Sequence, residues 1–304
     1  MKNNIRKMPE FNSDVKSGQE LCDNSKIVCP DVLCDDISDC DVLDAYIMKT
    51  YLKTQWFGSE IVVYDEIDST NDELKRLGNI SPKHGMLAVA ECQTKGKGRL
   101  GRNWMSKKGT GVWMSFMVCP PLAPKETAPI TLVAAMACCR AVKAITGLNA
   151  QIKWPNDLII NGKKIVGILT ELSADMKYVV VGVGINVNIP NFPDDLADKA
   201  SSLYSESKTF ISRNQLIGEF GNYFEKYYSI FVHDRNMSGL KSEYEKLMVN
   251  LNKEVRILGN TDVEDTGIAL GINDDGELLV RREKGDIITV RAGEVSVRGI
   301  YGYV

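Results

Sequence analysis

The pattern of apolar residues changes at Lys253, and this change divides the chain into two parts that must fold differently. After this point, short β-rich runs are separated by Gly and Asp turns. These runs are Glu254 to Leu258, Thr266 to Gly271, Glu277 to Arg281, Ile287 to Val290 and Glu294 to Val297. So many short strands within about fifty residues predict a small β-barrel. With 304 residues, the chain is long enough for this barrel and one larger domain.

The part before Lys253 mixes strands and helices. Apolar runs bounded by turn residues predict strands at Glu60–Asp65, Met86–Glu91, Val112–Val118 and Tyr178–Asn188. Longer helical patterns cover residues 126–145, 213–231 and 238–247. Asn161-Gly162 lies between two further β-rich runs, Leu158 to Ile160 and Lys164 to Leu169, and this dipeptide is the strongest short signal for a hairpin.

Residues 1–55 form a polar, acidic extension, which we expect to be partly disordered because its first half has no periodicity. From Asp31 to Asp44 the chain has six aspartates and no Lys or Arg, a charge that would repel a nucleic-acid backbone. A weak amphipathic pattern from Leu43 to Tyr51 predicts one short helix. The formal net charge of −3 also lacks the basic excess of most DNA-binding domains.

No apolar run approaches the roughly 18 residues of a membrane span, and the polar N-terminus does not resemble a signal sequence. We therefore expect a cytoplasmic protein without a membrane partner. The eight cysteines are then expected to be free thiols. Four of them are spaced too irregularly for an ordinary zinc site: Cys22, Cys29, Cys34 and Cys40. The two histidines, His84 and His233, are predicted to be ordinary surface residues, which argues against a His-based catalytic triad.

The stretch from Glu91 to Trp104 combines glycines with cations. Its glycines permit close backbone approach to an anion, and its Lys and Arg side chains supply positive charge. They are Gly96, Gly98 and Gly101, with Lys95, Lys97, Arg99 and Arg102. The glycine spacing fits neither a P-loop nor a dinucleotide fingerprint. An anion-binding loop and a solvated basic loop have the same composition, so both interpretations stay open.

A possible polar pocket wall follows the first predicted strand. Ser69 or Thr70 can cap a helix there, with Asp72 or Glu73 completing a capping box. Leu74 and Leu77 would face inward. The pattern fits an ordinary helix start as well as a ligand-binding surface formed by free N–H and O–H groups.

Polar residues also gather around the predicted hairpin. Lys153-Trp-Pro-Asn-Asp157 places a cation, an aromatic ring and two carboxyl-type side chains next to a sheet, where Lys164 would begin the return strand. This density favours a site over a plain turn. In the strand Tyr178–Asn188, Gly182 and Gly184 predict close approach by a ligand or by another backbone.

Taken together, these motifs resemble the biotin protein ligase family, and they occur in the family order between about residues 60 and 190. The matching segments are Asp68-Ser-Thr-Asn71, Gln93 with Gly96-Lys-Gly-Arg-Leu-Gly-Arg102 and Trp104, Lys153-Trp-Pro-Asn-Asp157, Lys164-Ile-Val-Gly-Ile168 and Gly182-Val-Gly-Ile-Asn-Val-Asn188. The resemblance implies an α+β fold. A mixed-sheet catalytic domain of the class II aminoacyl-tRNA synthetase and biotin ligase type, with helices on one face, would cover residues 56–250, and an SH3-like β-barrel would cover 251–304.

The resemblance also implies the reaction. Biotin and ATP, with Mg²⁺, would give biotinyl-5'-AMP and pyrophosphate, and a lysine of a biotin carboxyl carrier protein would then take the biotin. The implied catalytic residues are Arg99 and Lys164. The implied biotin site is Ser69, Thr70, Asn71, Gln93, Lys97, Gly98, Arg99 and Lys164. The implied nucleotide site is Gly96, Gly98, Arg99, Arg102, Trp104, Asn156 and Asn186. Asp157 is a candidate ligand for Mg²⁺, and the sequence leaves open whether the chain forms a homodimer.

Two departures from the family pattern matter. Many members carry Arg where this chain has Lys97, an exchange that matters only if the side chain binds in a bidentate manner. Regulatory members carry an N-terminal DNA-binding domain, and the segment before residue 56 is predicted to be too short and too acidic for one. The alternatives to a biotin ligase are a lipoate ligase, a biotin-responsive DNA-binding repressor and a protein that only sequesters biotin.

Overall fold

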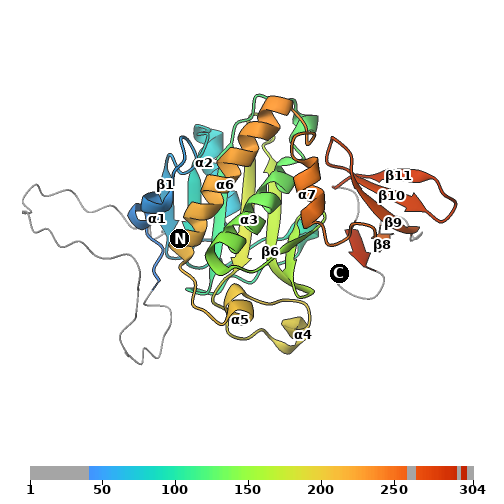
Figure 1. Cartoon of the computed structure of the whole chain (residues 1–304). Coiled ribbons are helices and arrows are strands. Elements are labelled where there is room, and N and C mark those ends of the chain that lie inside the picture. The colour runs from blue at the N-terminus through green and yellow to red at the C-terminus, as the bar shows by residue number, and fades with distance from the viewer. Residues whose placement is uncertain (1–40, 259–264, 293–295, 300–304) are drawn as a thin grey trace, which may run out of the picture.

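The computed structural model describes residues 41–258, 265–292 and 296–299 (Figure 1). The main domain is built on a seven-stranded sheet with the order β1-β2-β3-β7-β6-β5-β4. The strands are β1 (Ile61–Tyr64), β2 (Leu87–Ala90), β3 (Gly111–Val118), β4 (Gln151–Lys153), β5 (Asp157–Ile160), β6 (Lys163–Leu172) and β7 (Val179–Asn186). The β1–β2 pair is parallel and the other pairs are antiparallel, so the sheet is mixed, as predicted.

Helices pack on both faces of this sheet. They are α1 (Ala45–Tyr51), α2 (Thr70–Ile80), α3 (Ile130–Thr146), α4 (Asp194–Ala197), α5 (Leu203–Ser207), α6 (Arg213–Asp234) and α7 (Lys241–Leu247). In Figure 1, α3 and α6 lie side by side across one face, where they cover the larger core. Helix α2 contributes Leu74 to a second core with Met117 and Val180. These two residues alternate along their strands with residues of the larger core, so α2 lies on the opposite face. The expectation of helices on one face only is therefore wrong.

The predicted hairpin forms at Asn161-Gly162, which connects β5 to β6. Both turn residues have positive φ, 50° and 78°, the geometry that a two-residue type I′ turn requires. Helix α3 ends as predicted at Gly147, which takes the left-handed conformation with φ 73°. The hairpin pairs Asp157 with Gly167, and the Lys164 side chain at the start of β6 reaches back to Asp157 at 2.6 Å.

The C-terminal part is a five-stranded antiparallel sheet with the order β11-β10-β9-β8-β12. Its strands are β8 (Glu254–Leu258), β9 (Asp265–Ile272), β10 (Leu278–Arg282), β11 (Ile287–Val290) and β12 (Ser296–Gly299). The β9–β10 turn contacts the main domain, because the buried Trp154 indole N–H donates to the Gly276 carbonyl oxygen at 3.1 Å. The C-terminal sheet thus contacts the segment that the sequence singled out as a site.

The described chain begins in contact with the main domain. Asp41 accepts hydrogen bonds from the backbone N–H and guanidinium of Arg213, which is fully buried at the start of α6. The same guanidinium binds Glu91, the residue that opens the glycine-rich loop. Asp44 caps α1, and α1 packs on α6. Residues 1–40, including Cys22, Cys29, Cys34 and Cys40, lie outside the described residues, and the domain limits stay predictions.

Two sequence expectations need correction. The stretch Pro124–Thr146 is long and apolar enough to cross a membrane by length and composition, although it is mostly buried here as a core helix. His84 is not an ordinary surface residue: its ring lies 4.1 Å from that of Trp56, and its Nδ1 accepts the backbone N–H of Cys119. The thiols of Cys92, Cys119, Cys138 and Cys139 are free, as expected.

Candidate functional site

Two adjoining cavities lie beneath the glycine-rich loop. The smaller has a volume of about 50 Å³ and lies between the start of α2, the loop and strands β6 and β7. The larger has a volume of about 280 Å³ and lies between the loop, the segment 153–157 and residues 192–200. The residues that line both are Gly98, Arg99, Trp104, Asn156 and Lys164. Two ligands bound in these cavities would therefore meet at the same cations.

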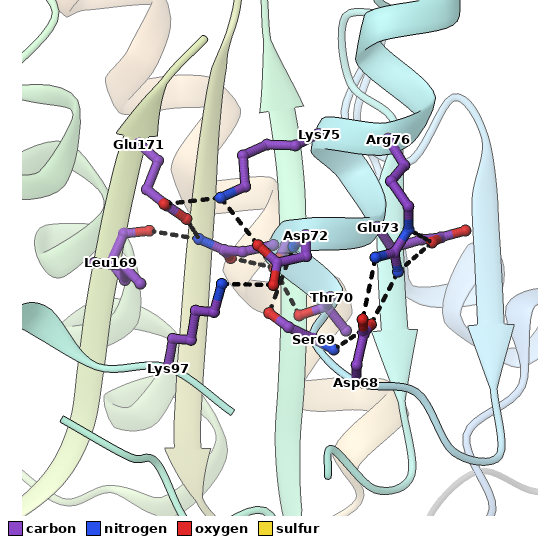
Figure 2. A network of polar contacts seen from close by, with 12 residues as sticks. Asp68, Ser69, Thr70, Asp72, Glu73, Lys75, Arg76, Lys97, Leu169 and Glu171 are labelled. Atoms are coloured by element: carbon purple, nitrogen blue, oxygen red, sulfur yellow. Dashed lines mark hydrogen bonds and ion pairs between the residues drawn. The ribbon is translucent and has the colours of Figure 1, made fainter. Parts of the chain in front are cut away.

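The start of α2 forms the polar wall of the smaller cavity. Ser69 caps the helix by accepting the backbone N–H of Asp72, and Ser69, Thr70 and Asn71 are all buried. The predicted capping box does not form, because the backbone N–H of Ser69 donates to Asp68 and not to Asp72. Asp72 instead pairs with Lys75 and Lys97 (Figure 2). The start of α2 is thus capped by the Ser69 side chain alone, and the Asp72 carboxylate links the helix to the glycine-rich loop through Lys97.

Hydrogen bonds join the buried polar residues of this wall. Asn71 Nδ2 donates to Glu171, and Asn71 Oδ1 accepts from Ser115 Oγ at 2.5 Å. Ser115 Oγ lies 2.7 Å from Thr70 Oγ1, and both N–H and Oγ1 of Thr70 contact Gln93 Oε1. Sequence analysis missed Ser115 and Glu171. The one available signal for Ser115 was a lone hydroxyl within an apolar strand.

The glycines of the central strands make room for side chains. A Cβ atom at Gly182 would lie 2.1 Å from Asn71 Oδ1, and one at Gly184 would lie 2.6 Å from Trp104 Nε1. A Cβ at Gly167 would also meet the Trp104 ring. The predicted close approach is therefore real, but it is made by side chains and not by another backbone. It allows an amide and an indole to lie flat on the sheet beside the cavities.

Three cations reach the site from two elements. Lys97 of the loop pairs with Asp72 at 2.6 Å. Arg99, also in the loop, donates to Asn156 Oδ1 at 2.8 Å and to the carbonyl oxygen of Ala292 in the C-terminal part. Lys164 pairs with Asp157 at 2.6 Å and lies 5.1 Å from the Trp104 ring centroid. The structure thus brings Lys97 and Arg99 of the loop, Asn156 and Asp157 of the segment 153–157, and Lys164 of β6 together. The sequence carries them in three separate motifs.

Burial and pairing set the charges of these groups. Burial lowers the pKa of the Arg99 guanidinium, which nevertheless remains a cation at neutral pH. Burial alone would raise the pKa of Asp72, but its contacts with Lys97 and Lys75 lower it. The site therefore combines a permanent cation with carboxylates that are already ion-paired, and an incoming anion would compete with these carboxylates.

The other predicted residues differ in how directly they reach the cavities. Arg102 lines the larger one, and Gln93 lines the smaller one. Asn186 lines the larger cavity but is buried and donates to the carbonyl oxygen of Ser201. Gly96 lines neither, and a Cβ there would lie 2.5 Å from the Trp104 carbonyl oxygen. Residues of the larger cavity that sequence analysis missed include Phe192, Leu196 and Lys199, which come from α4 and its flanking segments, where the sequence has no motif.

A divalent metal would find few protein ligands here. In the part of the chain that the structure describes, no group of three or more His, Cys, Asp or Glu residues could hold a metal ion. Asp157 is the one acid among the described residues that line the larger cavity. This suits Mg²⁺, which commonly binds through one or two carboxylates together with substrate phosphates.

Comparison with known proteins agrees with this geometry. Residues 63–188 match the Biotin/lipoate A/B protein ligase family, and residues 251–298 match the Biotin protein ligase C terminal domain. The bifunctional ligase/repressor BirA of Bacillus subtilis is 40% identical over 240 residues, which cover 77% of this chain and 73% of BirA. The biotin–acetyl-CoA-carboxylase ligase of Mycobacterium tuberculosis is 30% identical over 78% of this chain and 88% of its own length.

Solved structures extend the comparison to the fold. The biotin protein ligase from Aquifex aeolicus in complex with biotin and ATP matches with a TM-score of 0.70 and 32% identity, over 79% of this chain and 99% of that chain. The expected catalytic fold with an SH3-like C-terminal sheet is thereby confirmed. The chain belongs to the biotin protein ligases, within the Biotin/lipoate A/B protein ligase family.

Proposed function

We propose that this protein is an ATP-dependent biotin protein ligase, which makes biotinyl-5'-AMP and then transfers biotin to a lysine of a biotin carboxyl carrier protein. The observation that carries the proposal is the set of residues shared by the two cavities. Arg99 and Lys164 line both, so a carboxylate in the smaller cavity and a phosphate in the larger one would meet between the same two cations.

The first step needs no nucleophile from the protein. A carboxylate oxygen of biotin attacks the α-phosphorus of ATP, and pyrophosphate leaves with the bonding electron pair. The main obstacle is the repulsion between the two anions. A preorganised site overcomes it by holding the carboxylate and the phosphate in contact. Lys164 and Arg99 would offset the charge that builds on the α-phosphate, and one fixed donor of this kind is worth about 3 to 4 kcal/mol.

The second step releases AMP. The carrier lysine, as a neutral amine, attacks the carbonyl carbon of the mixed anhydride, and the bond to the phosphate oxygen breaks. Because the anhydride is easily hydrolysed, the site must exclude water until the lysine arrives. The loop that carries Arg99 lines both cavities and is tied to α2 by the Lys97–Asp72 ion pair, which suits a lid.

Mg²⁺ bound with ATP would neutralise phosphate charge, and Asp157, the one acid among the described residues that line the larger cavity, would hold it. Asp157 is paired with Lys164, so the same carboxylate that would hold the metal also keeps the Lys164 ammonium beside the cavity. We further propose a cytoplasmic location. The acidic segment from Asp31 to Asp44 argues against DNA as a partner, and salt-dependent DNA binding at micromolar protein would revive the repressor alternative.

Carrier biotinylation tests the proposal. The protein is incubated with biotin, ATP, Mg²⁺ and a biotin carboxyl carrier domain, and transfer is measured by the mass of the carrier. Absence of transfer, with the protein folded, would reject the proposal. A parallel reaction with lipoate tests the alternative in the same fold class, and the polar wall of Ser69, Thr70 and Gln93 supports biotin, whose ureido group needs neutral donors and acceptors.

A further inference from the structure

The carboxylate of Glu171 stands at one end of the chain of hydrogen bonds that runs along the smaller cavity (Figure 2). Asn71 Nδ2 donates to Glu171 Oε2 at 2.7 Å and to the Leu169 carbonyl oxygen at 3.3 Å. An ionised carboxylate and a carbonyl group can only accept hydrogen bonds. The orientation of the Asn71 amide is therefore fixed by chemistry, with Oδ1 turned toward Ser115.

This orientation determines where the hydroxyl hydrogens point. Ser115 must donate to Asn71 Oδ1 at 2.5 Å, so its own oxygen accepts from Thr70 Oγ1 at 2.7 Å. Thr70 has one hydroxyl hydrogen, and its other contact, at 3.1 Å, is with Gln93 Oε1. In either contact that hydrogen is used within the protein. Thr70 Oγ1 and Gln93 Oε1 therefore present only lone pairs to a ligand.

We propose that Glu171 is a positioning residue for ligand selectivity, which makes this part of the smaller cavity accept hydrogen bonds from N–H groups of the substrate. The inference rests on the proposed function, because it assigns the ureido N–H groups of biotin to these acceptors. Glu171 lines neither of these two cavities, although it lines a third one along the glycine-rich loop, and it acts on the smaller cavity through Asn71, Ser115 and Thr70. Selectivity for an N–H donor is thus set by an acid that does not touch the substrate.

A carboxylate, and not an amide, is needed at this position. Lys75 binds the other oxygen of Glu171 at 2.9 Å, so each oxygen has its own donor. Lys75 is also anchored to Asp72 at 3.0 Å. After Glu171→Gln, Lys75 and Asn71 would compete for a single oxygen, and the charged ammonium would take it because charge-assisted hydrogen bonds are the stronger ones. The new amide nitrogen would then face Asn71.

Packing limits how the Asn71 amide can respond. It is buried and packs directly on Gly182, where a Cβ atom would lie only 2.1 Å from Oδ1, so the sheet blocks movement of the amide on that side. Rotation in place, which exchanges its oxygen and nitrogen, removes the conflict with the new amide but gives up the 3.3 Å hydrogen bond to the Leu169 carbonyl oxygen. Asn71 would then donate to Ser115, Ser115 to Thr70, and the Thr70 hydroxyl would no longer be committed to Ser115. Thr70 Oγ1 would then accept from Ser115, and its hydrogen would go to Gln93 Oε1 or into the cavity, so these two oxygens would present fewer lone pairs to an N–H group of the ligand.

The test compares biotin with its two mono-N-methyl ureido derivatives by isothermal titration calorimetry, for the wild-type chain and for Glu171→Gln. We expect Glu171→Gln to raise the Kd for biotin about tenfold. One of the two derivatives carries its methyl group on the ureido nitrogen that would donate to Thr70 and Gln93, and its Kd should change by less than about threefold. The preference for biotin over that derivative therefore falls. The rate of carrier biotinylation at saturating biotin is expected to stay within about threefold.

Two further variants separate positioning from stability. Lys75→Gln removes the ion pair but keeps the carboxylate, so the preference should equal that of the wild type. Glu171→Gln combined with Asn71→Asp restores an acceptor-only group beside Ser115, so the preference should return. If the single variant does not fold, the double variant carries the test, and a preference that stays low there would overturn the inference.

The outcomes also separate the inference from the proposed function. Wild-type chain that transfers biotin, together with an unchanged preference in Glu171→Gln, would overturn the inference alone. Wild-type chain that neither binds nor transfers biotin would overturn the proposed function. Equal weakening of biotin and both derivatives in Glu171→Gln would show a purely structural role and would also overturn the inference.

Discussion

Lys164 occupies the point where the two cavities meet, and its ammonium is already balanced by Asp157 at 2.6 Å. Because it lies at the junction and not deep in the smaller cavity, it should matter for the reaction more than for biotin binding. We expect Lys164→Ala to lower the rate of adenylate formation by about 10²- to 10³-fold. The Kd for biotin should rise by less than about tenfold. Pyrophosphate release and calorimetry measure the two effects separately.

The neighbouring Lys163 provides a matched control for this prediction. Its ammonium donates to the Ala197 carbonyl oxygen, and it lines neither cavity. Lys163→Ala should therefore leave the rate of pyrophosphate release within about threefold of wild type. If Lys164→Ala weakened biotin binding as strongly as it lowered the rate, the assignment of Lys164 to charge stabilisation would be wrong.

His84 lies away from the site, and burial lowers its pKa, an effect that nearby Glu225 offsets only in part. The folded chain therefore disfavours the protonated ring more than the unfolded chain does. On acidification the unfolded chain binds the proton first. The contribution of neutral His84 to the free energy of unfolding is therefore complete above about pH 6.5 and is lost as the pH falls below that value. We expect wild-type stability to fall more steeply below about pH 6.5 than that of His84→Asn.

Thermal unfolding between about pH 5 and pH 7.5 measures this difference in slope. His84→Asn keeps an acceptor for the Cys119 backbone N–H but loses the ring contact with Trp56, whereas His84→Phe keeps a ring and loses the acceptor. Both substitutions remove the titrating group, so both should reduce the loss of thermal stability below about pH 6.5 to the same extent. Parallel slopes for wild type and both variants would contradict the role of His84.

At the residue scale, sequence could predict the groups that carry a recognisable motif, such as Lys164 and Arg99. It could not predict Ser115, a single hydroxyl within an apolar strand, or Glu171, near the end of β6, because the role of each depends on a distant partner. The partner, Asn71, reaches them across 44 and 100 positions of the sequence. Only the packing of α2 on β3 and β7 brings the three together.

The glycine-rich loop is the element on which the reaction depends most. Its Arg99 binds Asn156 on one side and the Ala292 carbonyl oxygen on the other, so the side chain spans the mouth between the cavities. We expect Arg99→Gly to let biotinyl-5'-AMP escape, because the loop loses the side chain that retains it. Lysines of unrelated proteins would then be labelled. Biotin incorporation into a mixture of proteins, detected by streptavidin, measures this loss of selectivity.

Arg99→Lys serves as the control for this prediction. It keeps the charge but cannot form both contacts through one planar group, so it should lie between wild type and Arg99→Gly in the extent of unspecific labelling. If Arg99→Gly labels proteins as selectively as wild type does, the loop does not retain the adenylate through this residue.

At the element scale, prediction from sequence succeeded where a local rule decides the structure. Asn161-Gly162 forms the hairpin because both residues take positive φ, and the strands on either side follow. It failed where competing partners were available. Asp72 had the correct spacing for a capping box, but Lys75 and Lys97 pair with it, while Asp68 takes the backbone N–H of Ser69. Lys75 and Asp68 are near in sequence and Lys97 is distant, and the spacing rule for a capping box takes account of none of these competitors.

At the scale of the whole molecule, the C-terminal sheet touches the site, which its sequence gave no means to predict. Its β9–β10 turn accepts a hydrogen bond from Trp154, a residue that lines the larger cavity. Ala292, next to β11, binds Arg99. The sheet therefore supports the larger cavity, where we propose that the nucleotide binds, and disturbing its contact should weaken ATP binding more than biotin binding.

Gly276 and Gly285 allow this contact to be tested against a matched control. Both have positive φ, 76° and 88°, so an added methyl group strains the backbone of either by about 1 kcal/mol. A Cβ at Gly276 would also lie 2.7 Å from Leu132 of α3, whereas nothing lies within 4 Å of one at Gly285. The difference between the two substitutions therefore reports on the contact between the C-terminal sheet and the main domain.

We expect Gly276→Ala to lower the free energy of unfolding by about 2 to 4 kcal/mol, from strain plus the overlap with Leu132. Gly285→Ala should lower it by about 1 kcal/mol. Chemical denaturation measures both values. Because Trp154 would lose its fixed acceptor, Gly276→Ala should also raise the KM for ATP about three- to tenfold and leave the Kd for biotin within about twofold. Equal effects of the two substitutions on stability and on KM would mean that the C-terminal sheet does not support the site through this turn.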